Sequence, residues 1–308
     1  MKREPLNINL SWWTGRVIGV VGTVIVIVWS IRILFRPDPQ IEVLGVALRP
    51  EAAEILEDIE RIAMAKLETR PVSLPNPALS TMVRSYISDY GVPTIEVPVG
   101  SKLTEEQVLH ELLHINQWAH GFPRDVGFSY GSLRSQAAIT RLKPVIGPFF
   151  FDTIDHFVFF PRMRRMGVDP YATARLLLRE EIVLDRLPTE IVELAKANEI
   201  ESHAIWTFKV ALEADDPNIV TASEESRGLN NEGLRIGKAL AQIVTARNPQ
   251  TPDEVASTRI AALNCLLGKQ GRFSFSGWTE KKKGHIVERK LGIWVDSPTA
   301  DDGCADSR

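Results

Sequence analysis

The stretch TEEQVLHELLHI, residues 104–115, decides the fold class that this chain is expected to adopt. It begins with Thr104, a residue type that commonly caps a helix N-terminus, and two acidic residues follow in the first turn. Apolar residues recur through the rest of the stretch, which predicts an amphipathic helix. His110 and His114 are four residues apart, so on a helix they project from one face, one turn apart. Two imidazoles placed in this way can bind one metal ion.

Glu111 completes the pattern His-Glu-x-x-His. A carboxylate beside a metal-bound water can accept its proton, while Zn2+ lowers the pKa of that water and polarises the scissile carbonyl. The pattern therefore predicts His110 and His114 as zinc ligands and Glu111 as the general base of a zinc-dependent hydrolase. The run TIEVPV at residues 94–99 predicts a strand leading into the helix, beside which an extended peptide substrate could pair.

A catalytic zinc site needs a third protein ligand and one open position. Residues 179–185, REEIVLD, together with HELLH resemble the gluzincin group of zinc peptidases, in which a downstream helix carries Glu-x-x-x-Asp. The resemblance implies that Glu181 binds zinc and that Asp185 accepts a hydrogen bond from a ligand histidine, which fixes the orientation of that ring. Glu180, one residue earlier, would place Leu184 where the aspartate is needed.

His120 stays open as an alternative third ligand. It stands at the metzincin spacing from His110, but Gln117 occupies the position where that family has a glycine for a sharp turn. Without that turn, His120 would point about 280° around the helix from His110 and away from the metal.

Asp155 is the remaining candidate for the third ligand. It lies beside His156 in the aromatic-rich segment 149–160, which predicts a buried helix whose polar residues face something specific. We expect His156 to act as a catalytic residue that donates to the oxyanion developing in the transition state.

Residues 17–35 predict a transmembrane anchor. Residues 17–31 are uncharged and rich in valine and isoleucine, the apolar run continues past Arg32, and tryptophans lie near both ends. The expected organisation is a tail at 1–16, the anchor at 17–35, a zincin-like domain at 36–295 and a disordered tail at 296–308. The protein is thus expected to be single-pass, and balanced basic residues leave open which side of the membrane the domain faces.

The composition of the chain limits the kinds of partner that it is expected to bind. Of the 308 residues, 44% are hydrophobic and 24% charged, which is ordinary for a globular domain, and the net charge of -3 gives no electrostatic case for nucleic acid. Cys265 lies in an apolar helical pattern and Cys304 in the polar tail, so we expect neither a zinc-thiolate site nor a disulfide framework.

The fold class expected from these patterns is α+β and mostly helical, with a small sheet beside the zinc helix. A loop is expected at 121–132, a hairpin at 272–276 and 285–295 with Lys281–Lys283 in its turn, and helices at 50–67, 78–90, 133–142, 146–166, 170–187, 189–213, 223–247 and 252–267.

The function predicted by the sequence is that of a membrane-anchored zinc metallopeptidase acting on peptide or protein substrates. The alternative is a membrane-tethered zinc-binding or helical interaction protein without catalytic turnover. Zinc content together with cleavage of a peptide library separates the two.

Overall fold

The structure is a computed structural model that describes residues 41–73, 83–132, 136–137, 139–140, 142, 146–171, 199–225, 230–297 and 304. The described residues from Val43 onward belong to one compact unit. This part of the chain is α+β, about half helical, with three small sheets, which confirms the predicted α+β class. The expected anchor at 17–35 lies outside the described residues, and no helix among those described is long and apolar enough to cross a membrane.

The helix expected around the His-Glu-x-x-His pattern is α3 (Glu105–Ala119). The Thr104 side chain accepts from the backbone of Gln107, and the Gln107 side chain accepts from the backbone of Thr104, which forms a capping box. The preceding helix, α2 (Pro50–Ala63), packs on α3 and ends at Met64, which adopts a left-handed conformation. A hairpin of β1 (Glu42–Val43) and β2 (Val46–Ala47) precedes α2.

A three-stranded sheet lies beside α3. It contains β3 (Glu68–Val72), β4 (Arg84–Ile87) and β5 (Pro93–Pro98), with β5 in the middle, parallel to β3 and antiparallel to β4. The strand expected at 94–99 is thus confirmed as β5. The prediction of a helix at 78–90 is wrong for its described part. Residues 84–87 form a strand that pairs with β5, and the Tyr86 hydroxyl donates to Glu96 at 3.0 Å.

The second three-stranded sheet joins distant parts of the chain. The hairpin of β7 (Arg272–Lys283) and β8 (Ile286–Asp296) was expected, although its turn follows Lys283 rather than including it. The loop expected at 121–132 is instead β6 (Pro123–Tyr130), which pairs in parallel with β8. Glycine and other turn-forming residues in this segment led to the prediction of a loop, and the strand that pairs with it lies far along the sequence.

The tip of the β7–β8 hairpin packs against the turn before β5. The Lys283 ammonium is buried, donates to the Ile87 carbonyl at 2.9 Å and pairs with Glu288 at 3.0 Å. Gly91 has φ +83°, and a Cβ added there would lie 2.4 Å from the Lys283 carbonyl oxygen, so only glycine fits.

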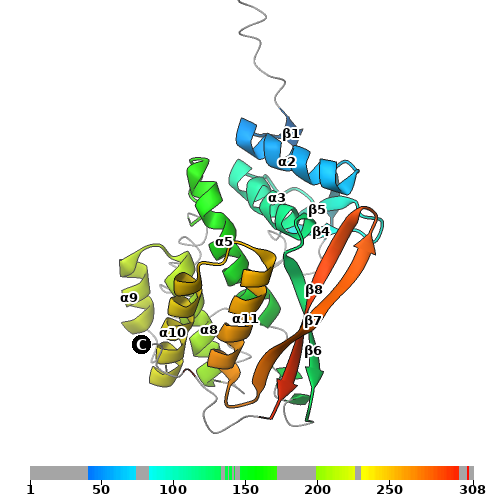
Figure 1. Cartoon of the computed structure of the whole chain (residues 1–308). Coiled ribbons are helices and arrows are strands. Elements are labelled where there is room, and N and C mark those ends of the chain that lie inside the picture. The colour runs from blue at the N-terminus through cyan, green and yellow to red at the C-terminus, as the bar shows by residue number, and fades with distance from the viewer. Residues whose placement is uncertain are drawn as a thin grey trace, which may run out of the picture. The chain divides into compact units, whose positions relative to one another are not determined.

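A helical layer completes the domain (Figure 1). Its helices share one hydrophobic core cluster with strands β6, β7 and β8. The described helices are the π-helical η2 (Ile146–Phe151), α5 (Asp152–Arg165), α8 (Glu199–Glu213), α9 (Pro217–Glu225), α10 (Asn231–Arg247) and α11 (Pro252–Leu267). They confirm the helices expected near 146–166 and 252–267, and the described residues within 133–142 are helical as expected. Between 199 and 247 the chain forms three helices, where two were expected at 189–213 and 223–247. Residues 172–198, with the expected Glu181 and Asp185 helix, lie outside the described part.

The two cysteines form a disulfide between α11 and the C-terminal tail. The expectation of no disulfide was wrong. The pair is 39 residues apart in sequence, yet the Cα atoms of Cys265 and Cys304 lie 4.3 Å apart. Spacing in the sequence gives no sign that these two cysteines are close in space.

Candidate metal centre

Three histidines converge in the interior of the domain. His110 and His114 come from α3 and His156 from α5, and one ring nitrogen of each lies within 4.8 Å of the others. The Nε2 atoms of His110 and His114 are 3.2 Å apart. Two nitrogens sharing a tetrahedral zinc at the usual bond length would lie about 3.3 Å apart. The three side chains therefore fit a metal ion.

Helical geometry and aromatic packing hold these rings in place. His110 and His114 are one turn apart on α3, and α5 packs against that helix. The Phe159 ring meets all three imidazoles edge to face, with centroids 4.9 to 5.4 Å away, and Phe160 stacks on His156 at 4.8 Å. The aromatic segment predicted to form a buried helix thus encloses the histidines in an apolar wall.

Glu213, at the end of α8, fixes the ring of His156. Its Oε1 lies 2.8 Å from His156 Nδ1, and its other oxygen accepts from Lys209. If Nδ1 carries the proton and donates it to Glu213, Nε2 presents a lone pair to the cluster. That Nε2 is buried and has no hydrogen-bond partner among the described residues. A carboxylate behind a metal-binding imidazole commonly has this role, which the sequence had suggested for Asp185.

The electrostatics of α3 favour neutral imidazoles. Burial, followed by the positive charge of neighbouring rings, lowers the pKa of His110 and of His114 well below the ordinary value. A neutral imidazole is the form that binds a metal. The Nδ1 atom of His114 is also buried and has no hydrogen-bond partner among the described residues.

His156 behaves differently because carboxylates flank it. Burial disfavours its protonated form, but Asp152 and Glu213 outweigh burial and raise its pKa. Burial likewise disfavours the Glu213 carboxylate, but Lys209 and His156 outweigh it and lower its pKa. In the metal-free chain, His156 and Glu213 thus stabilise each other as a charged pair.

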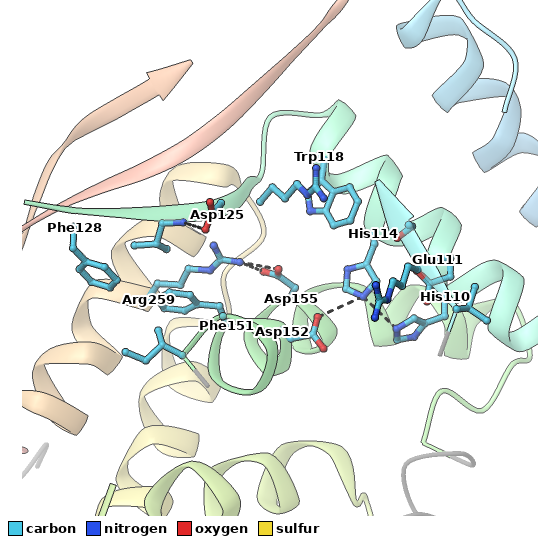
Figure 2. Close-up of a pocket in the computed structure, with 17 residues that line it drawn as sticks. His110, Glu111, His114, Trp118, Asp125, Phe128, Phe151, Asp152, Asp155 and Arg259 are labelled. Carbon is cyan, nitrogen blue, oxygen red and sulfur yellow. Dashed lines mark hydrogen bonds and ion pairs between the residues drawn. The ribbon is translucent and has the colours of Figure 1, made fainter. Parts of the chain in front are cut away.

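Two of the three histidines, His110 and His114, line a cavity of about 560 Å³. Figure 2 shows its lining, which combines side chains of α3 with Asp125 and Phe128 of β6, Asp152 and Asp155 of α5, and Arg259 of α11. Residues 83–85, at the start of β4, line it as well. A substrate could therefore reach His110 and His114 from this cavity.

Glu111 also lines this cavity, as its predicted role requires. Burial raises its pKa to about 7, although a hydrogen bond from the Ser85 hydroxyl opposes the rise. Ser85 belongs to β4, so the sheet and the histidine helix together position this carboxylate.

The other candidates for the third ligand that the structure describes, Asp155 and His120, are not part of the cluster. Both oxygens of Asp155 bond to Arg259, at 2.5 and 2.7 Å, and burial raises the Asp155 pKa to about 6 despite that guanidinium. His120 caps the end of α3 and pairs with Asp58 at 2.7 Å. Glu181 and Asp185 lie outside the described residues, so their roles stay predictions.

The chain was compared with protein-family models, with curated proteins and with solved structures, and none of the three comparisons gives a match. The likeness to the gluzincin group stays a resemblance of two short motifs, of which the structure describes one. Support for a metal site therefore comes from the histidine cluster, its carboxylates and the cavity beside them.

Proposed function

We propose that this chain is a zinc-dependent hydrolase of the metallopeptidase type. The observation that carries the proposal is the convergence of His110, His114 and His156 beside a cavity that His110, His114 and Glu111 line. Three protein ligands and an accessible side are the arrangement of catalytic zinc sites.

His156 is assigned here as the third ligand rather than as the oxyanion donor expected from the sequence. Its Nδ1 is engaged by Glu213, and its Nε2 lies buried beside the other two imidazoles. An oxyanion donor would instead need an N–H that faces the substrate. Zinc stoichiometry of His156→Ala and of Glu181→Ala, each against wild type, tests the assignment, because only loss of a true ligand empties the site.

Glu111 is assigned as the general base. When bound, zinc would activate a water molecule and polarise the substrate carbonyl. Glu111 faces the same cavity, and the Ser85 hydroxyl holds its carboxylate there, so it can accept the proton of that water and pass it to the leaving amine.

The geometry supports a peptide as the substrate. β4 pairs with β5 along one edge and is the last strand of its sheet in the described part of the chain. Its beginning lines the cavity, so an extended peptide could add to this edge and bring a carbonyl toward the histidines. The strand first expected to do this, β5, is paired on both sides. The predicted N-terminal anchor would place this activity at a membrane.

The test compares Glu111→Gln with Glu106→Gln, a carboxylate on the same helix that does not line the cavity. We expect wild type and Glu106→Gln to bind about one zinc and to cleave casein or a peptide library. Glu111→Gln should bind zinc equally and lose cleavage by at least about 100-fold, the range of a general base. A fully active Glu111→Gln would refute the assignment. Zinc without cleavage by the wild type would favour the non-catalytic zinc-binding alternative.

A further inference from the structure

A carboxylate that the sequence did not single out lies against the histidine cluster. Asp152 is the first residue of α5 and lines the cavity. We propose that Asp152 is a fourth protein ligand, so that the metal is held by three imidazoles and one carboxylate. The inference rests on the metal site proposed above and extends it.

The distances are those of ligands that share one ion. Asp152 Oδ1 lies 3.6 Å from His114 Nε2, and Oδ2 lies 3.4 Å from His156 Nε2. They are close to the 3.2 Å between the Nε2 atoms of the two α3 histidines. A tetrahedral zinc separates neighbouring ligand atoms by about 3.3 Å, so one ion could contact all of these atoms with small adjustments. Figure 2 shows the Asp152 carboxylate pointing toward His114.

The two helices contribute in the same way. His110 and His114 are spaced i,i+4 on α3, and Asp152 and His156 are spaced i,i+4 on α5, so each helix presents two donors one turn apart. α5 follows directly on the π-helical turn η2, and π-helical turns often occur at functional sites.

Asp152 is also available for a metal, unlike the neighbouring Asp155. In the part of the chain that the structure describes, its ion pairs are those with His114 and His156. Asp155, three residues on, has both oxygens bound to Arg259. Metal binding would therefore compete with no stronger partner of the Asp152 carboxylate.

A fourth ligand of this kind is compatible with hydrolysis. The Asp152 side chain is 36% exposed, against 9% for His114 and for His156, so it lies on the side of the cluster that solvent reaches. Catalytic zinc sometimes expands from four ligands to five, so four protein ligands still leave room for a water molecule, and Glu111 stays free to act as base. The carboxylate also adds a negative charge that raises affinity for divalent cations.

Direct ligation can be detected with Co2+, whose bonds to thiolate sulfur give an intense near-ultraviolet charge-transfer band. Both cysteines of the chain are in the disulfide, so the wild type has no free thiol to give that band. We expect the Co2+ complex of full-length Asp152→Cys to show it. Asp125→Cys, at another carboxylate of the cavity lining, should bind Co2+ without the band.

Affinity gives the second readout, measured by competition with a chelator for Zn2+. Loss of a residue that acts through a ligand weakens metal binding about 10- to 100-fold, and we expect a loss of Zn2+ affinity in this range for Glu213→Gln. Loss of a direct ligand should cost more, so Asp152→Asn should weaken Zn2+ binding by more than about 100-fold. Asp125→Asn should stay within about twofold of wild type, because its carboxylate pairs with Lys290 instead.

The outcomes separate the two proposals. If wild type binds zinc while Asp152→Asn binds it equally tightly and Asp152→Cys binds Co2+ without the band, Asp152 is not a ligand and the three-histidine site stands. If the folded wild type binds neither Zn2+ nor Co2+, the proposed function itself fails.

Discussion

Replacing Arg259 with methionine tests whether its buried ion pair with Asp155 stabilises the domain that carries the candidate site. Its side chain is 1% exposed, its guanidinium donates to both oxygens of Asp155 and to the Pro123 carbonyl at 2.8 Å, and it lies 4.7 Å from the Phe151 ring centre. Arg259 thus ties α11 to α5 and to the start of β6. Methionine is also long and flexible but cannot pair with the buried carboxylate.

The expected loss in the free energy of unfolding is about 3 to 5 kcal/mol, the cost of removing one partner of a buried ion pair. This corresponds to roughly a 100- to 4,000-fold fall in the folding equilibrium constant. Burial already raises the Asp155 pKa to about 6 with Arg259 in place, which indicates how poorly this environment solvates a charge. The double variant Asp155→Leu/Arg259→Met removes both charges and should recover most of the loss.

Urea unfolding followed by circular dichroism measures the effect in wild type, both single variants and the double variant. Each single variant should unfold at a clearly lower urea concentration than wild type. The double variant should lose less unfolding free energy than the two single variants lose in sum, which is the signature of direct coupling. Two results would refute the reasoning: an Arg259→Met midpoint equal to wild type, or losses that simply add. Either would mean that the ion pair does not stabilise the domain.

The remaining predictions concern helix packing and the disulfide. Gly237→Ala should destabilise the domain by about 1 to 3 kcal/mol, because the added Cβ would lie 2.5 Å from the Thr207 Cβ, whereas Gly147→Ala meets nothing within 4 Å and is the matched control in urea unfolding. Equal midpoints for the two would contradict the close contact of α8 with α10. Reduction of Cys265–Cys304, or Cys304→Ser, should lower the unfolding free energy by up to about 4 kcal/mol, the loop-closure value for a separation of 39 residues. A thiol titration showing free cysteines in the unreduced protein would argue against the link.

Local sequence was sufficient for the helix that carries the proposed chemistry. Thr104 and Gln107 cap α3, and the i,i+4 spacing places His110 and His114 on one face, because these features depend only on neighbouring residues. The same holds for α11, whose Thr251–Glu254 capping box lies within four residues.

The tertiary structure decided which residues complete the site. His156 joins the α3 histidines because α5 packs on α3, and Glu213 reaches His156 from a helix 57 residues further on. The aromatic neighbours of His156 predicted a buried helix whose polar residues face something specific. No local pattern showed that this histidine would meet the α3 histidines and Glu213.

Strand pairing also decided the two strands that were missed, over a long sequence distance for β6 and across a short turn for β4. β6 is a strand because the edge of β8, more than 150 residues away, accepts it, and β4 is one because β5 pairs with it beside the cavity. The chain by itself therefore determined the helix periodicity and the metal-binding pattern. The partner of β6, the disulfide and the full set of side chains around the histidine cluster followed from packing, since their energy comes from contacts that no local window contains.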